Sequence, residues 1–187
     1  MKKIGWVICC VLLSGNTAAL EIAGVKLADN VQLGNASLQL NGAGIRTKLF
    51  FKVYVGALYL PQKQTSAQAI IADEREHRMA LYLLRELGSE KLFTSFNEAI
   101  AANHTPAELN ALDTQLKQMK QIFDEVKQVN TGDVITLDYL PASGTRISVN
   151  GAPQGTIAGA AFNTALLKVW LGNKPVQDDL KLKLLGQ

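Results

Sequence analysis

The sequence predicts an α+β fold in which a largely antiparallel sheet has helices packed on one face. Apolar and polar residues alternate in strand fashion over residues 31–60, helical spacing takes over in 89–126, and alternation returns in 135–149. Strands and helices thus come in separate blocks, which favours antiparallel pairing over a parallel sheet. Because no repeat or linker interrupts this order, residues 20–187 are predicted to form a single domain.

The strand blocks carry the first specific expectations. Turns are expected at residues 34–35 and 41–44, where Gly and Asn cluster. In 51–59 the odd-numbered side chains, from Phe51 to Tyr59, are predicted to face the core. Residues 78–84 form a nearly continuous apolar run, which is typical of a strand covered on both faces.

The helical blocks have recognisable beginnings and ends. Residues 89–102 have helical spacing, and Thr105 to Glu108 form a capping box with Pro106 at the first helical position. This box is predicted to open one helix whose apolar stripe continues to Val126. A further helix is expected over 160–171, followed by a short last helix that ends near Leu185.

Residues 1–19 have the pattern of a secretory signal peptide. Two lysines precede a short apolar run that ends in small residues, and cleavage is expected after Ala19. The run is too short to span a bilayer, so no permanent membrane span is expected after cleavage, and the mature protein is predicted to be periplasmic or secreted. Cys9 and Cys10 both lie in this segment, which leaves the mature chain without cysteine.

Charge and composition exclude several functional classes. Without Lys2 and Lys3 the 19 basic residues fall to 17 against 16 acidic ones, a balance that argues against nucleic acid as a partner. The mature chain has no thiol for catalysis. His77, beside several acids, is predicted to lie at the surface, and His104, before a helix cap, in a loop. The two are far apart in the sequence without helical pairing, so no metal and no cofactor is expected.

Arg46 is the unusual cation of the sequence. It follows the small residues 42–44, which are expected to let backbone and ligand come close. It also has apolar neighbours on both sides, and an arginine in such surroundings needs an anion. Two partners are open at this point. One is a carboxylate of the protein itself, such as Asp138, and the other is the acidic head of a bound molecule.

Three segments, 41–48, 51–60 and 155–172, make the chain resemble the bacterial chalcone isomerase-like family, and the similarity extends over most of 22–186. The resemblance implies an open-faced β-sandwich, in which helices are layered on one face of a large antiparallel sheet and a ligand cleft lies between them. The family contains plant enzymes that cyclise chalcones, and also non-catalytic members that bind fatty acids in the same cleft.

The resemblance assigns roles to individual positions. Arg46 matches the arginine that holds a phenolate in the enzymes and a carboxylate in the fatty-acid binders. At the position where the enzymes have a threonine, this chain has Tyr54, and the fatty-acid binders have a tyrosine there too. The enzymes' tyrosine and asparagine fall near Gly88 and Ser95, and a polar-apolar pair of the enzymes becomes Val169 and Trp170. These changes remove the groups that orient a phenol, which argues against cyclisation.

The leading hypothesis is therefore an exported, non-catalytic protein that binds an acidic amphipathic small molecule such as a fatty acid through Arg46, Tyr54 and Trp170. One alternative is an isomerase or lyase acting on an enone or phenol, with Arg46 stabilising an oxyanion and Tyr54 donating a proton. A second is a structural module without ligand. Because Arg46 and Tyr54 are eight positions apart, about 26 Å on a straight strand, we expect the chain to fold back close to Thr47 and Lys48, pairing 37–45 with 50–60.

Overall fold

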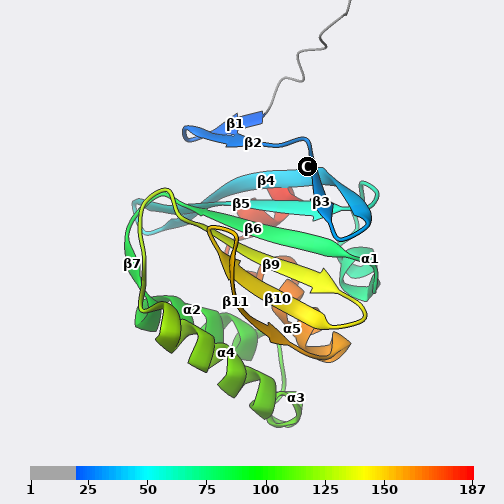
Figure 1. The fold of residues 1–187 in the computed structure, drawn as a ribbon, viewed down its shortest axis with the longest axis vertical. Coiled ribbons are helices and arrows are strands. Elements are labelled where there is room, and N and C mark those ends of the chain that lie inside the picture. The colour runs from blue at the N-terminus through cyan, green and yellow to red at the C-terminus, as the bar shows by residue number, and fades with distance from the viewer. Residues whose placement is uncertain (1–19) are drawn as a thin grey trace, which may run out of the picture.

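The computed structural model describes residues 20–187, which contain one large curled sheet (Figure 1). Its seven antiparallel strands follow the order β11 (Ala152–Ile157), β10 (Gly144–Val149), β9 (Val134–Leu140), β6 (His77–Leu83), β5 (Phe51–Leu60), β4 (Ala36–Lys48) and β3 (Asn30–Leu33). Two small pairs are separate from it: β1 (Leu20–Ile22) with β2 (Val25–Leu27), and β7 (Leu87–Gly88) with β8 (Gln128–Val129). The predicted signal peptide and both cysteines lie outside the described residues.

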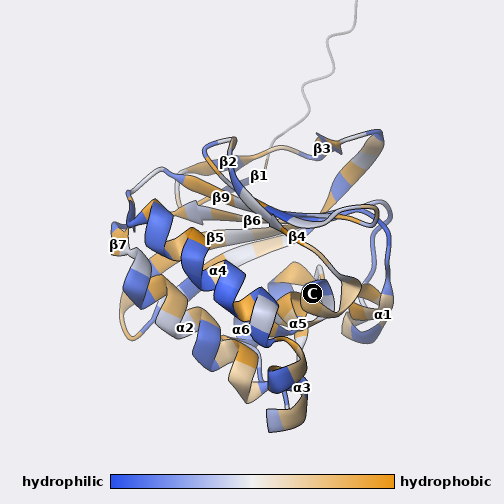
Figure 2. Ribbon diagram, turned by 60° about the horizontal axis from the view of Figure 1, so that its bottom comes forward, coloured by the Kyte–Doolittle hydropathy of each residue, from blue (hydrophilic) through white to orange (hydrophobic). Residues whose placement is uncertain are grey.

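The helices pack on one face of this sheet, which confirms the predicted α+β architecture (Figure 1). They are α1 (Ala67–Ala72), α2 (Ser89–Ala102), α3 (Pro106–Ala111), α4 (Asp113–Val126), α5 (Ala160–Leu171) and α6 (Asp178–Leu184). Figure 2 shows hydrophilic stretches along the outer side of α4 and largely hydrophobic residues in α5. Within residues 20–187, no helix has the length and apolar character needed to cross a membrane.

The predicted capping box is present, but the helix that it opens is shorter than expected. The Thr105 hydroxyl accepts a hydrogen bond from the Glu108 amide, and the Glu108 carboxylate accepts one from the Thr105 amide. The chain then breaks at Leu112, which ends α3 and precedes α4. Leu112 is buried in the main core, so the break turns this side chain inward.

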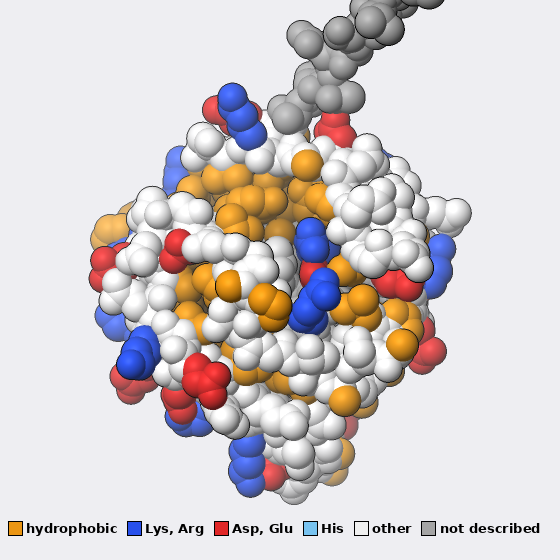
Figure 3. Space-filling model, in the orientation of Figure 1, with side chains coloured by type: hydrophobic (Ala, Val, Ile, Leu, Met, Phe, Trp, Pro, Cys, Tyr) orange, Lys and Arg blue, Asp and Glu red, His pale blue; other side chains and the backbone are white. Residues whose placement is uncertain are grey.

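Strand β5 is buried on both of its faces, which corrects the predicted core face. Val55, Ala57 and Tyr59 do pack in a core, but it is the smaller one, formed with residues of β2, β3 and β4. Tyr54 and Leu58, on the opposite parity, pack in the main core beneath the helices. On the side away from α5 and α6, hydrophobic side chains gather in a hollow below the β1–β2 hairpin (Figure 3).

Residues 41–44 do not form the expected turn, whereas the turn at residues 34–35 is confirmed by the β3–β4 hairpin. Strand β4 runs unbroken through 41–44, and α6 packs directly on it. A Cβ on Gly42 would lie 2.1 Å from the Lys183 carbonyl oxygen, and one on Gly44 would lie 2.8 Å from the Lys183 Cβ. The glycines therefore admit a helix of the protein itself, and not a ligand.

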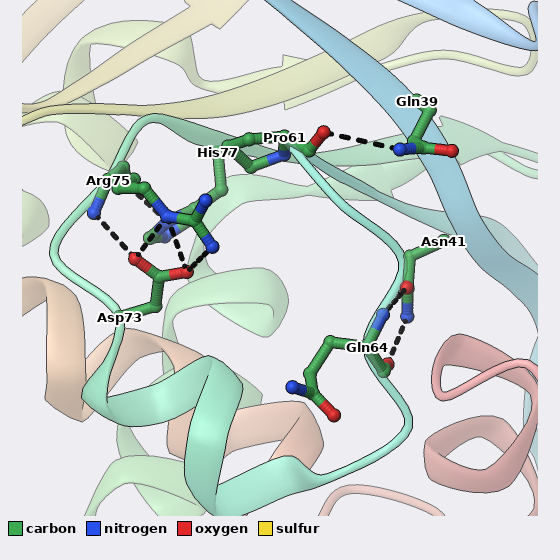
Figure 4. Close-up of polar contacts among 7 residues, drawn as sticks. All are labelled: Gln39, Asn41, Pro61, Gln64, Asp73, Arg75 and His77. Carbon is green, nitrogen blue, oxygen red and sulfur yellow. Dashed lines mark hydrogen bonds and ion pairs between the residues drawn. The ribbon is translucent and has the colours of Figure 1, made fainter.

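Asn41 fastens the same region to two distant parts of the chain. Its Nδ2 donates to the Leu184 carbonyl at 2.8 Å. Nδ2 also donates to the Gln64 carbonyl at 3.0 Å, and Oδ1 accepts from the Gln64 amide at 2.7 Å (Figure 4). The Asn41 side chain is 7% exposed, so these bonds satisfy a buried amide. They hold the end of α6 against β4.

His77 is buried, and its prediction as a surface residue was wrong. The residue is 3% exposed, with Nδ1 3.0 Å from the Arg75 carbonyl and Nε2 3.0 Å from Asn163 Oδ1 on α5. Burial lowers the pKa of its imidazole. Of the acidic neighbours that suggested exposure, Asp73 pairs with Arg75 beside His77 (Figure 4). His77 is the first residue of β6, and its contact with Asn163 on α5 places its side chain on the face of the sheet that the helices cover.

Candidate functional site

A cavity of about 880 Å³ lies between the sheet and helices α2, α4 and α5. Its walls are mainly apolar and include Leu81, Ile135, Phe96, Met119, Phe123 and Val169. The rings of Phe96 and Phe123, whose centroids are 6.0 Å apart, join α2 to α4 along this wall. The volume falls within the range of about 300 to 1,000 Å³ that is usual for small-molecule sites.

The β4–β5 hairpin places Arg46 beside Tyr54 at this cavity. The two residues are direct partners across the strands, and both line the cavity. Immediately after Arg46 the register shifts, so that Thr47 pairs with Lys52. This confirms the expected fold-back, with the irregularity at Arg46/Thr47 and the turn closing at Leu49 and Phe50. Cross-strand partners have Cβ atoms about 4.5 to 5.5 Å apart, close enough to hold one small head group.

Gln177, which sequence reasoning missed, holds the irregular segment in place. Its Oε1 accepts from the Thr47 amide at 2.8 Å and from Arg46 Nη1 at 3.2 Å, and its Nε2 donates to the Ile45 carbonyl at 3.3 Å. Arg46 Nη1 also donates to the Thr47 carbonyl. Gln177 is the residue that precedes α6, so its place before Asp178 and Asp179 marks a helix start, but nothing in the sequence indicates its partners.

Arg46 has no carboxylate within ion-pair distance among residues 20–187. The proposed internal partner was wrong, because Asp138 binds Arg78 at 2.5 Å and Arg146 at 3.1 Å. These three residues are direct neighbours across β6, β9 and β10. The face of the sheet away from α5 and α6 shows basic and acidic side chains near its centre (Figure 3). Within residues 20–187, the hydrogen-bond partners of Arg46 are therefore neutral oxygens, and no carboxylate neutralises its charge.

Tyr54 is 8% exposed, and its hydroxyl oxygen accepts a hydrogen bond from Trp170 Nε1 at 2.9 Å. Burial raises the pKa of the Tyr54 phenol to about 12, although the Trp170 bond and the charge of Arg46 both oppose this rise. The phenol thus keeps its proton at neutral pH and can donate it in a hydrogen bond to an anion. Trp170 forms part of the cavity wall and orients Tyr54.

The family follows from a comparison over nearly the whole described chain. The family model described as chalcone isomerase-like matches residues 19–186. The chain belongs to the chalcone isomerase-like family. A search of curated protein sequences found no significant match.

A solved structure supports the same fold. The crystal structure of a fatty-acid-binding protein of Arabidopsis thaliana is similar to this chain with a TM-score of 0.66 and 14% sequence identity. The match covers 87% of this chain and 92% of the plant protein. At this level of identity the similarity establishes the chalcone isomerase-like fold alone.

The positions carried over from the chalcone isomerase-like enzymes divide into two groups. Ser95 on α2 and Val169 and Trp170 on α5 all line the cavity. Gly88 lies before the first residue of α2, and it is not among the residues that line the cavity. Across residues 20–187, no three His, Cys, Asp or Glu side chains are grouped as metal ligands.

Proposed function

We propose that this protein binds an acidic amphipathic small molecule, such as a fatty acid, with its apolar part in the cavity and its head group at Arg46 and Tyr54. The observation that carries the proposal is an arginine without an acidic partner at a large apolar cavity. Transfer of an apolar chain from water to such walls is favourable, and an anionic head supplies the negative partner that Arg46 lacks.

The hydrogen-bonding groups support a carboxylate as the head. Arg46 Nη1 is engaged by Thr47 and Gln177, whereas Nε and Nη2 have no acceptor within residues 20–187. An arginine fork suits a carboxylate because two parallel N–H donors match its two oxygens. The Tyr54 hydroxyl adds a third donor. Because its oxygen accepts the hydrogen bond from Trp170 Nε1, its own hydrogen can be donated to the ligand.

The description of the Arabidopsis protein as a fatty-acid-binding protein is a property of that protein, and it supports the same class of ligand here. The isomerase alternative uses the same pair, with Arg46 stabilising an oxyanion. Tyr54 suits it less, because a phenol with a pKa of about 12 is a weak proton donor at neutral pH. A spectrophotometric assay with hydroxylated chalcones should show no cyclisation above the spontaneous rate, and cyclisation lost in Arg46→Ala would establish the isomerase.

Binding is tested with the purified protein in two steps. Native mass spectrometry should show a co-purified acidic lipid, and titration with a fluorescent fatty acid should show saturable binding. Arg46→Ala should weaken this binding by about 1.5 to 3 kcal/mol, the contribution of a hydrogen bond to a charged group, and Arg46→Lys should recover only part. Arg146→Ala is the matched control, since it removes an arginine from the other face of the sheet. Equal affinity of Arg46→Ala and the parent would refute the proposed site.

We also propose that the protein is exported and works in the periplasm or outside the cell. The support is the pattern of residues 1–19, with Lys2 and Lys3 before a short apolar run. N-terminal sequencing of protein from the exported fraction should give a start near Leu20. Retention of Met1 would overturn the proposal.

A further inference from the structure

The turn between β4 and β5 exposes three consecutive large hydrophobic residues. Leu49 is 82% exposed, Phe50 96% and Phe51 57%, and in 20–187 the other large hydrophobic residues with substantial exposure to solvent are Leu20, 44% exposed, and Leu182, 47%. Leu49 has a φ of 58°, in the left-handed region where turns ordinarily use Gly or Asn. The tip thus keeps bulky apolar side chains where both solubility and backbone geometry favour small polar ones.

Cationic side chains surround this tip. Lys48 and Lys52 are exposed on either side of it, and the Arg85 guanidinium lies 4.7 Å from the centroid of the Phe51 ring. Two acidic residues of α2, Glu90 and Glu98, line the adjoining cavity, and the exposed Glu86 follows Arg85 in the sequence. An apolar tip within a ring of basic groups matches a lipid bilayer with anionic head groups, where aromatic and aliphatic side chains enter the interface and Lys and Arg meet the phosphates.

The tip also belongs to the edge of the cavity. Lys48, Leu49, Phe51 and Arg85 line the same cavity as Arg46 and Tyr54. Figure 1 places the β4–β5 turn beside β7, at the end of the sheet where α2 begins. A bilayer in contact with the tip would therefore lie next to the cavity and to its unpaired arginine.

We propose that the Leu49–Phe51 tip, with Lys48, Lys52 and Arg85, inserts into the surface of an anionic bilayer and brings the cavity to it. This surface is where an acidic amphipathic ligand enters or leaves, and that second statement rests on the proposed function. The docking itself does not, because it needs no ligand in the cavity. The two can therefore fail separately.

The docking test uses two kinds of vesicle, both without free fatty acid. The anionic vesicles are made of equal parts phosphatidylglycerol and phosphatidylcholine, and the neutral ones of phosphatidylcholine alone. Phe50→Trp provides a local probe in the purified protein, with the emission of the parent's own tryptophans subtracted. Its fluorescence should shift to the blue on the anionic vesicles and be quenched by brominated acyl chains. Leu182→Trp, at an exposed position on α6, is the matched control and should show neither change.

Binding itself is measured by vesicle flotation. Phe50→Ser should weaken binding to the anionic vesicles roughly tenfold to a hundredfold, the effect of withdrawing one large apolar side chain, while Leu182→Ser should bind as the parent does. Salt at about 0.5 M should also weaken binding, since it screens the basic groups. Urea unfolding of each variant verifies that both variants remain folded.

Three results would overturn the inference. One is an unquenched Phe50→Trp together with unchanged binding of Phe50→Ser. Another is equal binding to both kinds of vesicle, which would remove the role of the basic ring. The third is self-association in the ultracentrifuge that depends on Phe50 without vesicle insertion, which would assign the tip to a protein interface. Transfer of a fluorescent fatty acid from vesicles to protein then tests the ligand: transfer that fails while docking succeeds counts against the proposed function alone.

Discussion

The arginines on the two faces of the sheet differ in the groups that their side chains bind. Arg78 and Arg146 share the buried carboxylate of Asp138 on the outer face. Arg46, on the cavity side, meets only the neutral oxygens of Thr47 and Gln177. The charges of Arg78 and Arg146 are met by a carboxylate of the chain itself, whereas Arg46 Nε and Nη2 have no acceptor within residues 20–187. This difference, and not the presence of an arginine as such, distinguishes a structural cation from a binding one.

The sharpest way to test this contrast is to remove one arginine from each face. Arg78→Met should lower the free energy of unfolding by about 3 kcal/mol, because it leaves the Asp138 carboxylate, 2% exposed, with one partner of the two. Arg46→Met removes no partner of a buried charge, so it should cost only about 1 kcal/mol in stability while fatty-acid binding weakens by about 1.5 to 3 kcal/mol. Urea unfolding measures both variants, and similar losses of stability would remove the distinction.

The pH dependence of stability shows how strongly the Arg46 region is shielded from water. The folded pKa of Tyr54 is about 12, above its ordinary value of 10.0, so its stabilising contribution is complete below pH 10 and is lost as the pH rises towards 12. Between these limits the parent should lose roughly 2 to 3 kcal/mol more than Tyr54→Phe. Unfolding curves at pH 8 to 11.5 should diverge accordingly, and parallel curves would show that the phenol is hydrated.

Substitution of Gly42 should disturb the Arg46 site and spare the Asp138 group. A Cβ there meets the Lys183 carbonyl oxygen at 2.1 Å, so Gly42→Ala must displace α6, at a cost of about 1 to 3 kcal/mol. Because α6 follows Gln177, fatty-acid affinity should fall as well. Gly88→Ala is the control, since its Cβ would meet nothing within 4 Å, and it should cost less than about 1 kcal/mol. Equal effects of the two would contradict the close packing of α6.

The smallest expected effect concerns Gln177 itself. Gln177→Ala removes the acceptor of the Thr47 amide and one of the two acceptors of Arg46 Nη1, and should lower stability by about 0.5 to 1.5 kcal/mol. Fatty-acid binding should weaken a few-fold, because the guanidinium is less well oriented. Gln154→Ala, which removes only a local bond to Ala152, should leave binding unchanged. Calorimetric titration of both variants provides the comparison, and unchanged affinity in Gln177→Ala would mean that Arg46 is positioned by β4 alone.

The local patterns of the sequence predicted much of this structure. Alternation identified the strands of 31–60 and 135–149, the Thr105 box identified a helix start, and the distance between Arg46 and Tyr54 required the fold-back that β4 and β5 make. Resemblance brought Tyr54 and Trp170 to the same site, and both line the cavity with Arg46. These features depend on neighbours in the chain or on a direct motif match.

Apart from the break at Leu112 that divides the predicted helix into α3 and α4, the errors concern contacts between distant segments. Gly42 was interpreted as part of a turn because nothing near it in the sequence indicates α6, which fills the space beside it. The contact of α6 with this strand joins residues 143 positions apart, Asn41 and Leu184. His77 was placed at the surface because its acidic neighbours are visible in the sequence, whereas Asn163 is not. Gln177 was missed for the same reason. Periodicity specifies which residues share a face, but not what covers it.

The double covering of β5 has a consequence for how the protein opens. This strand has β4 and β6 on its two edges, helices over one face and the smaller core over the other. Its central amides, over residues 55–59, are therefore shielded from solvent in every direction. In deuterated water they should exchange only when the whole molecule unfolds, while amides of the short β1–β2 hairpin exchange through local fluctuations. The last protons to exchange should thus lie on the strand that carries Tyr54.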